Sequence, residues 1–260
     1  NYYEERSHID KAFRNWNSSI YWVQGMQDWN VDPHQVFSGP PGTNWYTDYL
    51  EAGYAVRGML GQWGHDYPDQ WEKHENLGEG FGAEALQNMT RWDWAQDLFE
   101  WFEYYLKGIG DEPDMIAQIQ RNDGQWRIEE VWPPRDAEVY KIPLGSCTYS
   151  GVFVGGAPIV GGAVPGIGGE QSIIVECPDI NPDFDMHISG LATVHLSAVP
   201  TFDGGQVFIL MEDMMTGVRI GHATMDVRYH EGGSEPQTVT PGQEVTMMME
   251  FQAIDALVPA

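Results

Sequence analysis

Basic residues are scarce in this chain of 260 residues. It has 13 Lys and Arg against 39 Asp and Glu, so its formal net charge is −26. Nucleic acid and anionic membrane surfaces are negatively charged too and would repel it, so we expect neither as a partner. The acidic residues are scattered singly instead of forming a tail, which indicates a solvated surface and favours a saline habitat.

Long apolar runs are missing as well. Residues 151–169, which form most of the longest uncharged stretch, are interrupted by many Gly and by two Pro. A membrane helix needs about 20 mostly apolar residues in continuous helix, so we expect no membrane span. A signal-peptide pattern is absent too. Because Asn1 is not a natural start, that absence leaves export open.

Cysteine and metal-binding patterns are sparse. Two Cys, Cys147 and Cys177, allow either one disulfide or two buried thiols. A disulfide there would close a loop of about 30 residues and stabilise the fold by roughly 3–4 kcal/mol. The eight His lack metal-ligand spacing. Asp179, Asn181, Asp183 and Asp185 alternate as in a calcium loop, but Phe184 stands where that loop needs Gly. We therefore expect no metal and no cofactor.

What is present divides near residue 134, where Trp132-Pro133-Pro134 interrupts regular structure. Residues 1–134 alternate between strand-like and helix-like patterns, which predicts the C-terminal part of an α/β domain. We expect strands over 20–23, 55–60, 115–120 and 126–131, and helices beginning near Pro33 and over 45–52 and 91–107. The sequence Asn122-Asp123-Gly124 predicts a hairpin turn.

The helix predicted over 91–107 has the clearest periodicity. Thr90 with Asp93 suggests a capping pattern, and Gly108 fits the C-terminal cap. Its apolar residues follow the 3.6-residue period and are expected on one face that packs against the core: Ala95, Leu98, Phe99, Phe102, Tyr105 and Leu106.

Residues 135–260 change to short β-rich runs separated by Gly, Pro and Asp. Their spacing predicts an antiparallel sandwich of the jelly-roll type, with a long Gly-rich loop over 151–169. The chain stops just after a strand pattern, so the sandwich is expected to be truncated. The expected strands are 139–144, 172–176, 192–198, 206–212, 221–229 and 244–252.

Two chemically capable residues follow consecutive strands of the first part. Asp28 lies in the segment Gly25–Val31 and His65 ends the segment Gly61–His65. Acid followed by histidine, each beyond a strand end, is the chain order of an α/β-hydrolase triad after its nucleophile. Asp28 would orient the histidine, and His65 would act as general base. The alternatives are a helix cap for Asp28 and a hydrogen-bonded loop histidine for His65.

A nucleophile elbow is absent. The pattern Gly-x-Ser-x-Gly does not occur, and Ser38 and Ser146 lie outside a strand-turn-helix context. We therefore assign no nucleophile in the chain and expect the serine upstream.

These segments resemble the X-prolyl dipeptidyl peptidase and cocaine-esterase family of serine hydrolases. Gly25–Val31 resembles the family segment that carries the triad Asp, and Gly61–His65 the segment that carries the triad His. Trp101–Gly108 resembles a helix end of the family, and 204–208 and 249–252 resemble parts of its jelly roll. The resemblance implies an α/β-hydrolase followed by a β-jelly roll, with acyl transfer to water from an amide or ester.

The expected protein is therefore a secreted or cell-surface serine hydrolase, closest to an X-prolyl dipeptidyl peptidase, that acts on a peptide or a small ester or amide. A homo-oligomer is left open. The alternative is a non-enzymatic binding or surface protein that keeps the same scaffold. Because its strands lack earlier neighbours, residues 1–260 alone are expected to be insoluble or unstable, and inactive.

Overall fold

The computed structural model describes residues 18–28, 31, 45–70, 90–143, 180, 183–215, 217–233 and 235–260. By its contacts the chain divides into two compact units. One comprises Asn1–Ala137 with Met186–Val258, and the other comprises Glu138–Asp185 with Pro259–Ala260. The predicted domain boundary near residue 134 stays a prediction.

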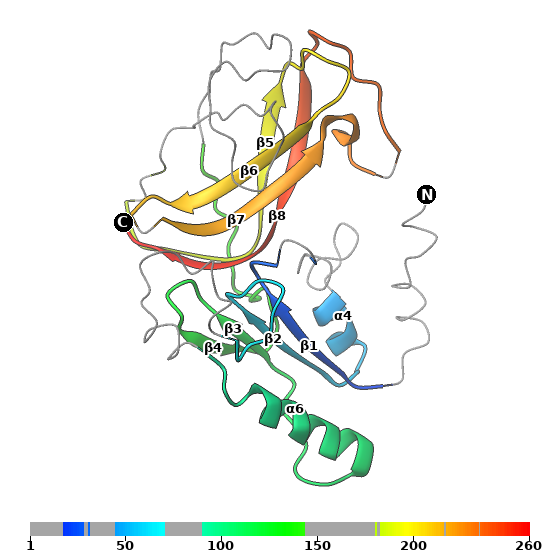
Figure 1. Ribbon diagram of the computed structural model, residues 1–260, viewed down its shortest axis with the longest axis vertical. Coiled ribbons are helices and arrows are strands. Elements are labelled where there is room, and N and C mark those ends of the chain that lie inside the picture. The colour runs from blue at the N-terminus through cyan, green and yellow to red at the C-terminus, as the bar shows by residue number, and fades with distance from the viewer. Residues whose placement is uncertain are drawn as a thin grey trace. The chain divides into compact units, whose positions relative to one another are not determined.

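The first sheet has the strand order β1-β2-β3-β4 (Figure 1). Strands β1 (Ile20–Gly25), β2 (Val56–Gly61) and β3 (Ala117–Gln120) run parallel, and β4 (Trp126–Glu129) returns antiparallel to β3. The four predicted strands of this part are confirmed, with bounds shifted by one to a few residues. Their apolar runs suit parallel strands, which are covered on both faces.

Helix α4 (Trp45–Glu51) lies between β1 and β2 in the chain and confirms the helix predicted there. It places Tyr46 and Tyr49 in the same hydrophobic core as Val56 and Leu60 of β2. Gly58 makes room for this helix, because a Cβ there would lie 2.9 Å from Cε2 of Tyr46. Tyr46 of α4 thus packs against the middle of β2.

Helix α6 (Trp94–Phe102) is shorter than predicted and continues as a π-helical turn, η2 (Glu103–Lys107). The expected Gly108 cap is confirmed, with φ of 67° in the left-handed region that Gly adopts readily. The expected capping pattern is wrong: Asp93 occupies the N-cap without a side-chain cap bond and instead pairs with Arg91.

The predicted core face of α6 and η2 is wrong for four of its six residues, whereas Leu98 and Tyr105 are half-buried. Phe99, Phe102 and Leu106 are 53%, 48% and 75% exposed, whereas Trp101 is 1% exposed. Ala95 is exposed too. The helix is rotated so that Asp97 faces the sheet and bonds to residues on three of its strands.

The later strands form two antiparallel pairs (Figure 1). Strand β5 (Met186–Ala198) pairs with β8 (Val245–Val258), and β6 (Gln206–Asp213) pairs with β7 (Val218–Asp226), which leads into the 3-10 turn η3 (Val227–Tyr229). Four of the predicted β runs are thereby confirmed as strands. The jelly-roll arrangement itself stays a prediction.

Strand β8 changes character along its length. From Val245 to Glu250 buried and exposed residues alternate, as in a strand with one covered face. From Phe251 to Ala256 every residue is buried, and Ala253 belongs to the core that contains Ile20 and Trp132. The C-terminal half of β8 therefore shares its core with the first sheet.

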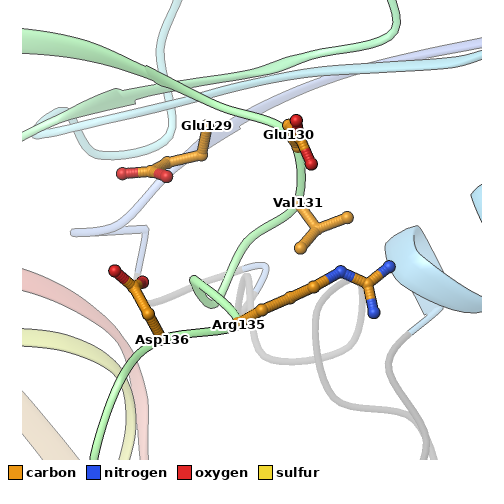
Figure 2. Close-up of a pocket in the computed structure, with 5 residues that line it drawn as sticks. All are labelled: Glu129, Glu130, Val131, Arg135 and Asp136. Atoms are coloured by element: carbon orange, nitrogen blue, oxygen red, sulfur yellow. The ribbon is translucent and has the colours of Figure 1, made fainter.

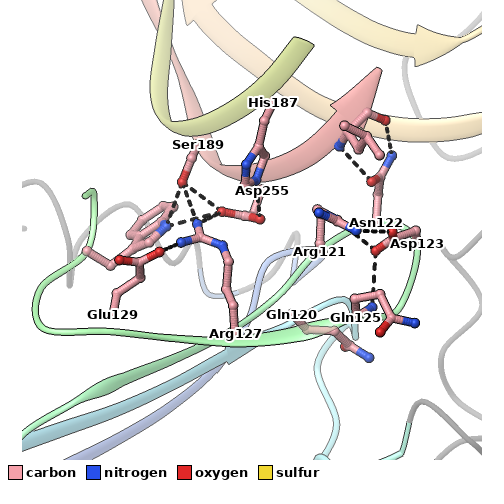
Figure 3. A network of polar contacts seen from close by, with 12 residues as sticks. Gln120, Arg121, Asn122, Asp123, Gln125, Arg127, Glu129, His187, Ser189 and Asp255 are labelled. Carbon is pink, nitrogen blue, oxygen red and sulfur yellow. Dashed lines mark hydrogen bonds and ion pairs between the residues drawn. The ribbon is translucent and has the colours of Figure 1, made fainter. Parts of the chain in front are cut away.

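A polar network joins β4 to β5 and β8 at Asp255, whose side chain has no exposed surface (Figure 3). Its Oδ1 lies 2.9 Å from Nε2 of His187, and its Oδ2 accepts from Ser189 Oγ at 2.7 Å and from Arg127. Trp132 Nε1 donates to Oδ2 at 3.4 Å. A charge that is withdrawn from water is thus surrounded by donors.

The β3–β4 turn continues this connection. Gly124 adopts φ of 82° there, and the antiparallel pairing confirms the predicted hairpin. The Asn122 side chain pairs with the backbone of Leu257, donating to its O at 3.1 Å and accepting from its N at 2.8 Å (Figure 3). The hairpin is therefore bonded to the end of β8 by an amide that imitates backbone pairing.

One further strand prediction is wrong for its described part. Residues 139–143 of the expected strand 139–144 form no strand. Val139 is 90% exposed and Tyr140 67% exposed. The run has β-favouring residues, but strand propensity is realised only where a neighbouring strand supplies hydrogen bonds and cover.

Several predictions fall outside the described residues and are not tested. They concern the helix beginning near Pro33, the pair Cys147 and Cys177, the loop 151–169, the strand 172–176, residues 179, 181 and 182 of the 179–185 segment and the residues Ser38 and Ser146. Within the part of the chain that the structure describes, no helix is long and apolar enough to cross a membrane.

Candidate active site

Two glycines bring the candidate loops together. Gly25 and Gly61 end β1 and β2 as partners in register. A Cβ on Gly25 would lie 2.1 Å from the backbone O of Trp63, and one on Gly61 would lie 1.8 Å from Cζ3 of its ring. Only glycine fits at either position, so both motifs must begin with Gly for the Trp63 backbone and ring to pack between them.

Backbone hydrogen bonds then fix the two loops side by side. The N–H of Met26 donates to Gly61 O at 2.7 Å, and that of Gln27 donates to Trp63 O at 3.0 Å. Trp63 and Met26 are each 1% exposed. The segments that lead to Asp28 and His65 are therefore tightly packed and hydrogen-bonded to each other.

The structure brings Asp28 and His65 together. Oδ2 of Asp28 lies 2.9 Å from Nδ1 of His65. The carboxylate side chain is only 5% exposed, whereas the imidazole is 63% exposed. Of the two predicted site residues, one is thus a buried acceptor and the other a solvent-facing ring held by it.

Both carboxylate oxygens of Asp28 have further donors. Oδ1 accepts the backbone N–H of Val31 at 2.9 Å, and Oδ2 accepts from Nε2 of Gln24 at 3.3 Å. The same Gln24 amide donates to Val31 O at 2.9 Å. The bond from Val31 resembles a cap or turn bond, so the alternative role of Asp28 is partly present beside its bond to His65.

This geometry is able to support proton transfer. A carboxylate bonded to Nδ1 favours the imidazole tautomer with its proton on that nitrogen, which leaves Nε2 as the basic atom. The buried carboxylate can also stabilise the imidazolium that forms when Nε2 takes a proton.

A separate hollow of about 180 Å³ is lined by Glu129, Glu130, Val131, Arg135 and Asp136 (Figure 2). Several of its charges are already paired: Glu129 with Arg127, and Arg135 with Glu51 at 3.0 Å. The hollow contains neither Asp28 nor His65. It is therefore not the candidate site.

Metal-binding geometry is not found in the described ranges. No group of three or more His, Cys, Asp or Glu there is placed to hold a metal ion. His195 and His222 lie on β5 and β7, as the sequence suggests, and His187 bonds to Asp255.

Sequence reasoning missed a set of buried glutamines around the two loops. Four glutamines are 4% exposed or less: Gln27, Gln62, Gln120 and Gln252. The first two belong to the segments that carry Asp28 and His65. Glutamines that support a site have no characteristic spacing in a sequence. The only sign of them was that Gln27 and Gln62 lie inside the two segments that carry Asp28 and His65.

No family model matches the chain. It is 26% identical, over 150 residues, to a protein of Streptomyces avermitilis named a putative Xaa-Pro dipeptidyl-peptidase. That match covers 57% of this chain and 18% of the relative.

The fold resembles solved hydrolases. An aminopeptidase from a marine sediment archaeon of the Thaumarchaeota matches with a TM-score of 0.65 at 12% identity, over 100% of this chain and 48% of that one. A CocE/NonD family hydrolase from Staphylococcus aureus matches with a TM-score of 0.52 at 10% identity, over 93% and 44%. At such identities the structures show likeness of fold alone.

The resemblance to the X-prolyl dipeptidyl peptidase and cocaine-esterase family is confirmed. The chain spans about half the length of the solved structures of this kind that it matches. The activity of the whole protein is therefore a matter for proposal.

Proposed function

We propose that this chain supplies the acid and the base of a serine hydrolase that cleaves amide or ester bonds through an acyl-enzyme. The observation that carries the proposal is the 2.9 Å contact between Asp28 Oδ2 and His65 Nδ1. The proposed layout is the end of an α/β-hydrolase domain, residues 1–134, followed by a β-jelly roll, residues 135–260.

The proposed reaction uses a serine from outside these residues as nucleophile. As its Oγ attacks the carbonyl carbon, Nε2 of His65 takes the hydroxyl proton, and Asp28 stabilises the resulting imidazolium. His65 then gives that proton to the leaving amine or alcohol. Water, activated by the same nitrogen, hydrolyses the acyl-enzyme and restores the serine.

Among the possible substrates we favour peptides with proline in the second position. The support is the name of the curated relatives, putative Xaa-Pro dipeptidyl-peptidases. An esterase activity of the cocaine-esterase kind is the alternative within the same mechanism. Both share the acyl-enzyme and differ only in the leaving group and the shape of the substrate pocket.

The test uses the complete protein that contains this chain. A chromogenic Gly-Pro or Ala-Pro amide and a p-nitrophenyl ester are assayed side by side, before and after treatment with a fluorophosphonate. We expect hydrolysis, its loss on treatment, and a labelled serine outside residues 1–260. Asp28→Ala should lower kcat by roughly 10⁴-fold, because the histidine loses its orienting partner.

Asp203→Ala serves as control, because Asp203 is an exposed residue of the β5–β6 connection and makes none of the contacts described for Asp28 and His65. It should keep the parent rate. Absence of hydrolysis and of labelling would contradict the proposal and favour a non-enzymatic binding protein.

A further inference from the structure

The side chain of Gln62 makes an unusual number of contacts for a buried amide. It lies three residues before His65 and is 4% exposed. Its Nε2 lies 3.0 Å from Gln120 O of β3 and 3.2 Å from Asp255 O of β8, and it also lies 3.2 Å from Sδ of Met26. The amide thus reaches elements from three distant parts of the chain.

The oxygen of the same amide faces the other candidate loop. Oε1 of Gln62 accepts from Nε2 of Gln27 at 3.2 Å, and Gln27 is the residue directly before Asp28. A single side chain therefore connects the segment that carries the acid to the segment that carries the base.

The backbone of Gln62 is fixed as well. Its N–H donates at 2.9 Å to Oε1 of Gln120, a side chain with no exposed surface. Gln62 is thereby bonded to β3 through both its backbone and its side chain. This leaves the start of the His65 loop with little freedom to shift along the sheet.

Strands β7 and β8 hold the Asp28 loop from the other side. Nε2 of Gln252, a residue of β8 that is 1% exposed, donates to the backbone O of Met26. Nε2 of Gln27 also lies 3.4 Å from Arg219 O of β7. Both contacts fall within two residues of Asp28.

These bonds are buried, so they resist rearrangement. An amide that loses its partner away from water leaves an unsatisfied donor or acceptor at a cost of about 1–3 kcal/mol. A buried network therefore tends to keep one geometry, and catalytic groups need positions accurate to a fraction of an ångström.

We propose that Gln62 is a positioning residue for the hydrolytic reaction. Its amide sets the separation of the Asp28 and His65 loops and fastens both to β3 and β8. Strands β7 and β8 are in this way part of the catalytic apparatus, because they hold the loops that carry the acid and the base. This inference rests on the proposed function of Asp28 and His65.

The decisive variant is Gln62→Met in the complete protein, which keeps an unbranched side chain of similar length and removes the hydrogen bonds. The matched control is Gln118→Met. Gln118 is 6% exposed and lies on β3, two residues before Gln120, but its amide bonds to Arg91 and Asp97. Both variants lose buried amide bonds, and only the first disturbs the two loops.

We expect Gln62→Met to lower kcat by roughly 10–100-fold with KM changed less than about 3-fold, because misplacement by about 1 Å can cost that much. Gln118→Met should keep kcat within about 3-fold at a temperature where both variants are folded. If Gln62→Met does not fold, Gln62→Asn, which keeps the amide on a shorter side chain, is judged by the same comparison.

The Asp28→Ala background distinguishes a positioning role of Gln62 from general damage to the fold. In Asp28→Ala the acid–base pair is already lost, so adding Gln62→Met should change the residual kcat by less than about 3-fold. Equal kcat in Gln62→Met and Gln118→Met, or an undiminished effect in the Asp28→Ala background, would overturn the inference. Failure of Asp28→Ala to lower kcat would instead overturn the proposed function.

Discussion

At the scale of single residues, Asp255 is a fully buried carboxylate that needs hydrogen-bonding partners. Its carboxylate has no exposed surface and is met by Arg127, His187 and Ser189. Burying a charge is costly unless it is paired and hydrogen-bonded, and here both oxygens have partners. Removing the carboxylate would take this buried partner from His187, Ser189 and Trp132, while Arg127 would keep its ion pair with Glu129.

We therefore expect Asp255→Ala to lower the free energy of unfolding by about 3 kcal/mol, because several buried donors lose their acceptor at about 1–3 kcal/mol each. Urea unfolding followed by circular dichroism measures this, with the exposed Asp203→Ala as control, which should stay within about 0.5 kcal/mol. A loss for Asp255→Ala no greater than that of the control would mean that the contacts of the Asp255 carboxylate in Figure 3 add nothing to stability.

Residues of the site differ in how far the sequence predicts them. Asp28 and His65 were predicted because each follows a strand-like run in a segment with a characteristic glycine. Gln62 and Gln252 were not, because their partners lie far away in the chain: Gln252 bonds to Met26, 226 positions earlier. Local patterns carry no information on such contacts.

At the scale of elements, α6 shows a polar residue on the helix face that packs against the sheet, beside the buried Trp101. Asp97 bonds to Arg57 of β2 at 2.7 Å and to Gln118 of β3 at 3.0 Å, and also accepts from Tyr21 of β1. Apolar periodicity predicted that Phe99 and Phe102 would face the core. The polar partners on the sheet turn the other face inward, and periodicity does not register them.

The Tyr21 bond leads to a prediction about alkaline pH. Burial, and next the bond to Asp97, raise the pKa of Tyr21 well above its usual value. The pKa of the folded state then exceeds the unfolded value of about 10, so the stability that Tyr21 provides is complete below pH 10 and is lost as pH rises further.

Tyr21→Phe should therefore be less stable than the parent at pH 8, by about 1 kcal/mol for the lost hydrogen bond. It should also lose less stability between pH 9 and pH 11. Urea unfolding of parent and variant at these pH values gives both numbers. An equally steep decline in the variant would show that Tyr21 does not titrate in this way.

At the scale of the whole molecule, strand β8 of the second half contacts the core and the site loops of the first half. Ala253 of β8 belongs to the core of the first sheet, and Gln252 and Asp255 bond to the loops beside the site. Composition and periodicity predicted strands that alternate with helices in the first half and a succession of strands in the second half. The shared core was not predictable, because a sequence boundary such as Trp132-Pro133-Pro134 says nothing about how segments on its two sides pack.

The most direct test of the account is the turnover of His65→Ala in the complete protein, measured on whichever chromogenic amide or ester the parent hydrolyses. We expect kcat to fall by roughly 10⁶-fold, because the general base is removed. His195→Ala, which alters an exposed histidine of β5, should keep the parent rate. Near-normal turnover in His65→Ala would contradict the assignment of His65, and with it the catalytic role of its partner Asp28.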